Sequence, residues 1–205
     1  MSEPVEALLF DLGNVILKID FQRTTTRWAE HAGCDPKALW KRYSPDEAYK
    51  KHERGLIDDA GYFAALRTML EIDISDEQFL DGWNATFGGP IAGVEEWLAP
   101  ACAALPSYVF SNTNPAHELY FRANYAELLK PFRTVFTSSG IGHRKPDREA
   151  FDYVAQQMGV APGRILFFDD ALANVEGARA AGLQAVHVRS NDDVMAALRP
   201  LVPGV

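Results

Sequence analysis

Five short apolar runs, most of them separated by segments with helical patterning, limit the fold more than any other feature of this sequence. The runs are Val5–Phe10, Tyr108–Phe110, Thr134–Phe136, Ile165–Phe168 and Ala185–Val188. Short strands that alternate with helices are typical of a parallel, doubly wound sheet with right-handed crossovers. We therefore predict an α/β protein with a Rossmann-like core.

One connection is too long for this pattern. Almost a hundred residues separate Asp11 from Ser107, whereas a strand–helix–strand unit needs about 30 residues in total. The stretch has few strand signals, and its helical patterns cover Asp20–Ala32, Pro36–Tyr43, Pro45–Arg54, Asp58–Glu71 and Asp76–Phe87. We predict that residues 19–89 form a helical cap inserted after the first strand, with residues 1–18 and 90–205 as the core and Gly88-Gly89-Pro90 as the return linker. An insertion at this point can cover a site at the sheet edge as a lid.

Charge and composition limit the partners. The chain has 28 acidic and 20 basic residues and a net charge of −8, which argues against a nucleic-acid partner because phosphate backbones attract basic surfaces. No apolar run approaches the roughly 20 residues of a membrane span, and the first residues lack the basic start of a signal peptide. We expect a cytoplasmic protein whose partner is a small molecule, with Cys34 and Cys102 as free thiols. The sequence leaves the oligomeric state undetermined.

Polar residues follow the predicted strands at the ends where ligands gather in open α/β sheets. They are Asp11, then Ser111 and Asn112, then Lys145, and finally Asp169, Asp170 and Asn174. An aspartate there can act as a nucleophile, hydroxyl and amide groups before a helix suit a phosphate, and clustered oxygen ligands suit Mg²⁺. Each residue alone could be a turn, cap or surface residue. Their common position at strand ends predicts one shared site.

These segments resemble the haloacid dehalogenase superfamily of aspartate-nucleophile hydrolases over essentially the whole chain. The segment Phe10–Val15, together with His52-Glu53-Arg54-Gly55 in the predicted cap, is similar to the subgroup that contains bacterial α-D-glucose-1-phosphate phosphatase. The resemblance implies an α/β core with a helical cap, a bound Mg²⁺ ion and phosphatase activity.

The resemblance also implies a role for each site residue. Asp11 attacks phosphorus, Lys145 neutralises charge, and Asp11, Asp170 and the Gly13 carbonyl bind Mg²⁺. Ser111 and Asn112 hold the phosphate oxygens, Asp169 is an accessory acid, and Asn174 stands where many members have another acidic residue.

Gly13 is the one departure from the phosphatase pattern. Most phosphatases of the superfamily have a second aspartate at this position, which protonates the leaving group and activates water. The loss of one acid–base group typically lowers the rate by about 10²–10⁴-fold. His52 or Glu53 could supply the missing group and contact the substrate, or both could lie on the exposed face of their helix. The glycine itself could be required for a positive φ.

We therefore expect a Mg²⁺-dependent phosphomonoester hydrolase that forms an aspartyl-phosphate on a small phosphorylated metabolite, such as the sugar phosphate glucose 1-phosphate. One alternative is a haloacid dehalogenase, which needs no metal, so that the Asp169-Asp170 pair argues against it. The other is a weakly catalytic phosphate-binding or regulatory protein, which the Gly13 substitution would explain.

Overall fold

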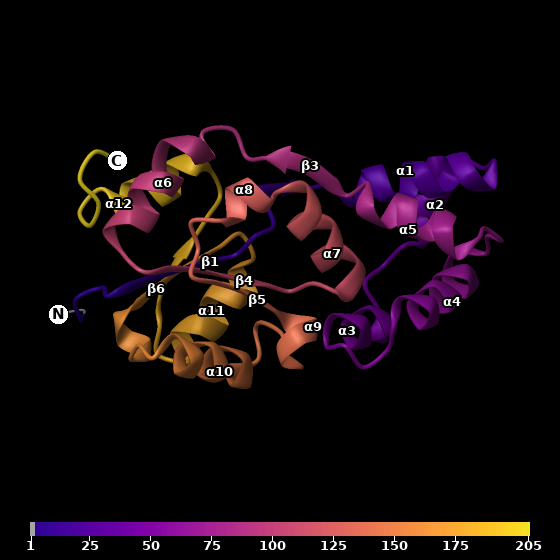
Figure 1. Ribbon diagram of the computed structural model, residues 1–205. Coiled ribbons are helices and arrows are strands. Elements are labelled where there is room, and N and C mark those ends of the chain that lie inside the picture. Colours follow the sequence, from indigo (N-terminus) through magenta and orange to yellow (C-terminus); the bar gives the residue numbers. More distant parts are fainter. Residues whose placement is uncertain (1–2) are drawn as a thin grey trace.

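The computed structural model describes residues 3–205 and contains the predicted parallel sheet (Figure 1). Its strands are β1 (Ala7–Phe10), β4 (Ser107–Ser111), β5 (Thr134–Thr137), β6 (Ile165–Asp169) and β7 (Gln184–His187). They lie in the order β5-β4-β1-β6-β7, and every neighbouring pair is parallel. The predicted fold class is confirmed, and Asp11 follows the central strand.

Helices cover both faces of the sheet, and β1 supplies both faces with apolar side chains. Leu8 and Phe10 face α6 (Val94–Ala104), α7 (Pro115–Asn124) and α12 (Asn191–Leu198), whereas Ala7 and Leu9 face α10 (Arg148–Met158) and α11 (Leu172–Ala180). This alternation is the period of two expected of a strand. The short helices α8 (Ala126–Leu129), α9 (Ser138–Ile141) and η1 (Pro162–Arg164) complete the core. The strand that ends at Asp11 is therefore held on both sides.

The long connection is helical, as the sequence predicted. It contains α1 (Phe21–Ala32), α2 (Pro36–Arg42), α3 (Glu47–Glu53), α4 (Asp59–Leu70) and α5 (Asp76–Asn84). The residue before each helix accepts a backbone N–H bond through its side chain: Asp20, Asp35, Asp46, Asp58 and Ser75. Such caps satisfy orphan donors at each helix start and explain why the helices begin where they do.

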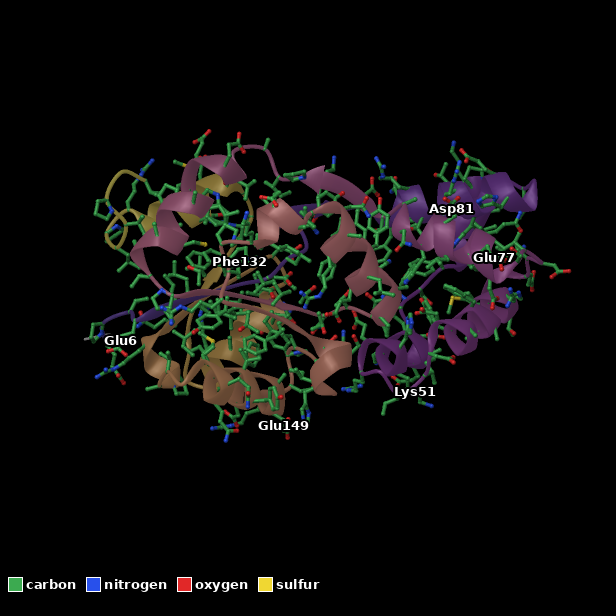
Figure 2. All side chains as sticks on the ribbon, in the orientation of Figure 1. Glu6, Lys51, Glu77, Asp81, Phe132 and Glu149 are labelled. Carbon is green, nitrogen blue, oxygen red and sulfur yellow. The ribbon has the colours of Figure 1, made fainter. Side chains whose placement is uncertain are left out.

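Aromatic side chains fill the interior of the cap. Trp28 stacks on Trp83 with ring centroids 5.9 Å apart, and Phe79 packs edge-on against Trp28. Figure 2 shows Lys51 and Glu77 pointing outward from the cap, whereas Phe132 lies among the core side chains. The cap thus has an apolar cluster of its own, separate from the two clusters on the sheet faces.

The two segments that connect cap and core pair as strands, and the predicted return linker Gly88-Gly89-Pro90 forms most of the second. β2 (Leu17–Ile19) and β3 (Phe87–Pro90) form an antiparallel ribbon in which Leu17 pairs with Pro90 and Ile19 with Phe87. Each strand has only three or four residues, and β3 is mostly glycine and proline, so neither has the apolar alternation that predicts a strand. The predicted cap boundaries fall within this ribbon.

Within residues 3–205, the structure has no helix with the length and apolar character needed to cross a membrane.

Candidate active site

A cavity of about 310 Å³ lies at the carboxyl ends of the strands, where the cap meets the sheet. Asp11, Ser111, Lys145 and Asp170 line it from the core. Phe21, Tyr49 and Glu53 line it from the cap. The predicted convergence of the strand ends is therefore present in the structure, and the cap covers it.

Lys145 occupies the centre of a buried ion-pair cluster. Its Nζ donates to Asp11 Oδ1 at 2.8 Å, to Asp169 Oδ2 at 2.7 Å and to the carbonyl oxygen of Phe110 at 2.8 Å. The side chain is 0% exposed. Burial alone would lower the pKa of Lys145, but the charges of Asp11 and Asp169 outweigh it and raise the pKa above the ordinary value. The lysine is therefore a fixed positive charge beside Asp11.

Asp11 is held at the end of β1, where its N–H donates to the Phe168 carbonyl at 2.8 Å. Burial raises the pKa of Asp11 to about 7, and Lys145 opposes this while Asp169 and Asp170 add to it. Asp11 must lose its proton to act as a nucleophile. More positive charge beside Asp11 would favour that ionised form.

Asp11, Asp169 and Asp170 place carboxylate oxygens within 4.8 Å of one another. Asp169 is already saturated, because it accepts from Lys145, from the Ala171 N–H and from the Asn174 amide. Burial raises the pKa of Asp170. Since three carboxylates lie together with a single lysine, which contacts two of them, the cluster has an excess of acidic groups that suits a hard divalent cation.

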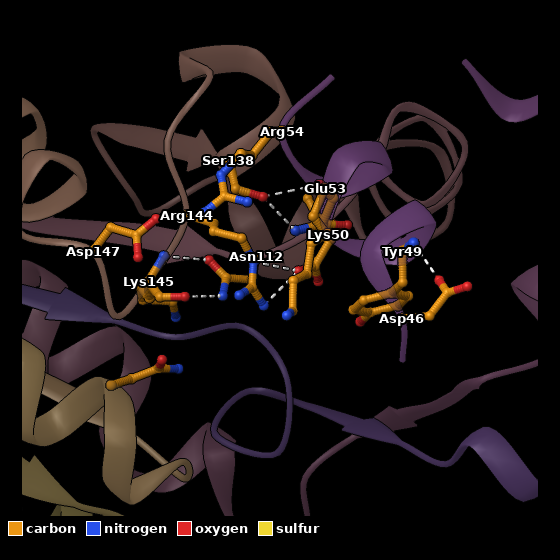
Figure 3. Close-up of polar contacts among 12 residues, drawn as sticks. Asp46, Tyr49, Lys50, Glu53, Arg54, Asn112, Ser138, Arg144, Lys145 and Asp147 are labelled. Carbon is orange, nitrogen blue, oxygen red and sulfur yellow. Dashed lines mark hydrogen bonds and ion pairs between the residues drawn. The ribbon is translucent and has the colours of Figure 1, made fainter. Parts of the chain in front are cut away.

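Asn112 lines the cavity, and its amide contacts the backbone of Lys145. Its Oδ1 accepts from the Lys145 N–H and its Nδ2 donates to the Lys145 carbonyl, both at 2.8 Å (Figure 3). The amide group is therefore engaged with the backbone of Lys145 and positions that residue. Ser111 is buried and lines the cavity, which is the location its predicted contact with phosphate requires.

The structure separates His52 from Glu53. His52 is 0% exposed, lies 2.8 Å from Asp59 through Nε2 and stacks on Tyr62, and it does not line the cavity. Its predicted contact with substrate is not supported by this position. Glu53 is 3% exposed and does line the cavity. The alternative that both residues lie on an exposed helix face is wrong.

Gly13 lines the cavity next to Asp11. Its φ lies outside the positive range, so the backbone does not require glycine there. A Cβ atom at this position would lie 3.1 Å from Ile19 Cγ1 and 3.8 Å from Asp11 Oδ2. A Cβ atom at this position would thus need the Ile19 side chain to move by a few tenths of an ångström.

Asn14, Arg144 and Tyr49 are among the site residues that the sequence did not single out. Asn14 donates from Nδ2 to Asp170 Oδ2 at 2.9 Å, Arg144 contacts Glu53, and Tyr49 lines the cavity. Asn14 and Arg144 are neighbours of predicted site residues in the sequence, which is the one signal that could have singled them out. Tyr49 has no such signal, because it is one of several aromatic residues in the cap.

The comparison with protein-family models agrees with this geometry. The model for haloacid dehalogenase-like hydrolases matches residues 5–182, which is most of the chain. The chain belongs to the haloacid dehalogenase-like hydrolase family. The predicted superfamily and the prediction of a hydrolase are therefore confirmed for this haloacid dehalogenase-like protein.

The relatives of this haloacid dehalogenase-like hydrolase differ in name and in length. The chain is 21% identical over 194 residues to D-ribitol-5-phosphate phosphatase from Bacteroides thetaiotaomicron, covering 92% of itself and 94% of that protein. It is 32% identical over 143 residues to enolase-phosphatase E1 from Stenotrophomonas maltophilia, covering 68% and 60%. It is 28% identical over 201 residues to drimenol cyclase drtB from Aspergillus calidoustus, covering 93% of itself but about a third, 35%, of that protein.

Solved structures share the fold. A haloacid dehalogenase family enzyme from Bacteroides thetaiotaomicron, in complex with magnesium and inorganic phosphate, matches with a TM-score of 0.82 at 24% identity, covering 95% of this chain and all of that one. L-2-haloacid dehalogenase from Xanthobacter autotrophicus matches with a TM-score of 0.70 at 20% identity, covering 97% and 85%. The cap and core are thus arranged as in known members of the family.

Proposed function

We propose that this hydrolase is a Mg²⁺-dependent phosphomonoesterase for small phosphorylated metabolites, with sugar and polyol phosphates such as glucose 1-phosphate as its substrate class. The observation that carries the proposal is the position of Asp11, a carboxylate in the cavity with Lys145 Nζ at 2.8 Å. The names of two relatives, a ribitol-phosphate phosphatase and an enolase-phosphatase, support the reaction class.

The residues of the cavity fit the metal. Asp11 and Asp170, with the Gly13 carbonyl, would hold Mg²⁺, because Asp169 is saturated by Lys145, Asn174 and Ala171. When bound, Mg²⁺ offsets the repulsion between the Asp11 carboxylate and a phosphate dianion. Asp169 would act indirectly: its ion pair with Lys145 positions the ammonium group and partly neutralises its charge.

In the proposed reaction, an Asp11 carboxylate oxygen forms a bond to phosphorus and the ester P–O bond breaks. The leaving oxygen takes a proton from solvent, since Gly13 offers no side-chain acid, and departs as an alcohol. Water then adds to the aspartyl-phosphate, gives up a proton to solvent, and releases inorganic phosphate and the Asp11 carboxylate. Lys145 would stay charged throughout, and Ser111, which lines the cavity, would hold a phosphate oxygen.

A screen for phosphate release tests this proposal. The panel contains glucose 1-phosphate, ribitol 5-phosphate, glucose 6-phosphate and p-nitrophenyl phosphate, each with Mg²⁺ and with EDTA. We expect release from at least one sugar or polyol phosphate, reduced at least about 100-fold by EDTA. Equal phosphate release in Mg²⁺ and in EDTA would exclude a requirement for the metal. Chloride release from 2-chloropropionate without metal would favour a dehalogenase, and tight phosphate binding without turnover would favour a regulatory protein.

Gly13 leads to a prediction about the second step. Without a side-chain base at this position, hydrolysis of the aspartyl-phosphate is expected to be slower than its formation from esters with good leaving groups. Rapid-quench experiments with p-nitrophenyl phosphate should show a burst of nitrophenol approaching one equivalent of enzyme. Gly13→Asp, whose Cβ requires a small movement of Ile19, should shrink the burst and speed the steady state by about 10²-fold.

Gly13→Ala is the matched control, since it adds the Cβ without the carboxylate. It should keep the burst, and its melting temperature shows what the Cβ alone does to stability. No burst in the wild-type enzyme, together with a folded Gly13→Asp variant that is no faster, would mean that another group in the cavity already activates water.

A further inference from the structure

Arg144 connects the core to the cap inside the cavity. Its Nε and Nη2 lie 2.8 and 2.7 Å from the same Glu53 oxygen, Oε2 (Figure 3). The Glu53 side chain is 3% exposed and that of Arg144 is 19% exposed. Both residues line the cavity that contains Asp11. The pair is therefore a part of the substrate cavity and not a surface ion pair.

The end of α3 holds Glu53 in this position. The next residue, Arg54, donates to Asp147 Oδ2 at 2.7 Å, which is a second contact between cap and core. Gly55 has a φ of +68°, and a Cβ there would lie 2.8 Å from the Ser139 carbonyl oxygen. This close approach fixes the C-terminal end of α3 on the core. Glu53 and Arg144 thus meet in a defined geometry.

The Glu53–Arg144 pair sets the net charge in the part of the cavity that the cap lines. Near Asp11, a bound Mg²⁺ and Lys145 would oppose the carboxylates. On the cap side, Glu53 neutralises Arg144. Tyr49 remains an uncharged hydroxyl, because burial and the charge of Glu53 raise its pKa well above the ordinary value. A leaving group therefore meets hydrogen-bonding groups without net positive charge.

A leaving group that carries an anionic group of its own, in addition to the phosphate of the ester, would fit this region poorly. To reach Arg144 it would have to separate the guanidinium from Glu53, and it would then lie against a buried carboxylate. A hydroxylated, uncharged leaving group can bond to Glu53, Tyr49 or Arg144 without separating the pair. Specificity of this kind comes from repulsion of the wrong ligand as much as from contacts with the right one.

We propose that the Glu53–Arg144 pair selects phosphate esters with uncharged, hydroxylated leaving groups and rejects esters that carry a second anionic group. This inference rests on the proposed phosphatase function and makes its substrate class specific. Glu53 and Arg144 are specificity residues in it, and neither moves a proton in the reaction.

Glucose 6-phosphate and 6-phosphogluconate test the proposal, since they share a six-carbon chain and a phosphate at C6 and differ at C1, which is a carboxylate in 6-phosphogluconate and an uncharged, ring-closing aldehyde carbon in glucose 6-phosphate. The measured quantity is the ratio of kcat/KM for 6-phosphogluconate to that for glucose 6-phosphate. The wild-type ratio should be below about 0.1. Glu53→Gln frees Arg144 and should raise the ratio at least about tenfold, mainly through a lower KM for 6-phosphogluconate. Arg144→Gln leaves the Glu53 carboxylate without its cationic partner and should lower the ratio further.

The double variant Glu53→Gln/Arg144→Gln separates electrostatics from general loosening of the cap. The ratio in the double variant should not show the increase seen in Glu53→Gln, because no guanidinium remains to bind the carboxylate of 6-phosphogluconate. Arg54→Gln breaks the neighbouring cap–core ion pair, which does not line the cavity, while the close approach of Gly55 to Ser139 still holds the end of α3. It should leave the ratio within about twofold of the wild type. Calorimetric titration of both esters into Asp11→Asn variants with Mg²⁺ should show the same change in relative affinity without turnover.

A folded Glu53→Gln variant whose ratio changes less than twofold would overturn the proposal, as would a gain that persists in the double variant. If Glu53→Gln does not fold, Arg144→Gln decides: an unchanged or higher ratio overturns the proposal. Failure of the phosphatase function would look different, because wild-type protein would then release no phosphate from p-nitrophenyl phosphate or from either sugar ester.

Discussion

Asp11→Asn is expected to lower kcat by about 10⁴-fold or more, because the amide cannot attack phosphorus and no covalent intermediate forms. The fold should persist. Asparagine has the shape of aspartate, and the substitution removes one acidic group from a cluster of three carboxylates and one lysine. Phosphate release and the melting temperature, measured on the same preparation, check both expectations.

Asn174→Ala provides a comparison for this variant, since Asn174 contacts Asp169 and not Asp11. It should reduce activity much less than Asp11→Asn, through a poorer orientation of Asp169. Asp11→Asn protein that is folded and retains more than about a hundredth of wild-type activity would remove Asp11 from the role of nucleophile.

Lys145→Met is expected to remove activity and to destabilise the fold. The substitution leaves Asp11 and Asp169 buried without the cation that contacts both at 2.7–2.8 Å. Removing one partner from a buried ion pair typically costs about 3–5 kcal/mol. Loss of a preorganised positive charge at the reaction centre should also reduce kcat by about 10²–10³-fold or more.

The loss of stability in Lys145→Met should depend on pH with a defined sign. The pKa of Asp11 in the fold is already raised to about 7 from the ordinary 3.8, so the fold binds a proton that the unfolded chain releases. Stability therefore falls as pH rises between these values. Without Lys145 the ionised carboxylate is still less favourable, so the destabilisation should be larger at pH 8 than at pH 5.

Urea unfolding of wild type and variant at pH 5 and pH 8 measures this difference. Lys130→Met, at a 74% exposed lysine, is the control and should change stability by less than about 0.5 kcal/mol at both pH values. A Lys145→Met variant within 1 kcal/mol of the wild type at pH 8, with activity within twofold, would place Lys145 outside the site.

The core and its site could be predicted because both follow from a strong pattern. Apolar runs indicate parallel strands, and such strands bring their carboxyl ends to one edge, so Asp11, Ser111 and Asp170 had to lie near one another once the sheet formed. The β2–β3 ribbon could not be predicted, because its pairing depends on the folded cap bringing Leu17 beside Pro90.

The sequence also could not predict the direction in which individual side chains of the site point. His52 and Glu53 are consecutive residues on α3, so they point about 100° apart around the helix, and the sequence does not say which of them faces the core. The structure turns Glu53 to the cavity and His52 to Asp59. Similarly, the sequence could place Asn112 at a strand end but could not show that its amide is bound by the backbone of Lys145.

The β2–β3 ribbon has a consequence for how the chain folds. β1 must pair with β4, yet Leu8 and its partner Ser107 are almost a hundred residues apart, which makes this contact one of the most non-local in the sheet. Once the cap helices have packed and the ribbon has closed, Leu17 and Pro90 are neighbours. The loop that remains to be closed between β1 and β4 then consists of two short segments, and its entropy cost is much reduced. A cap that folds early would thus bring β1 and β4 close together and speed the assembly of the sheet.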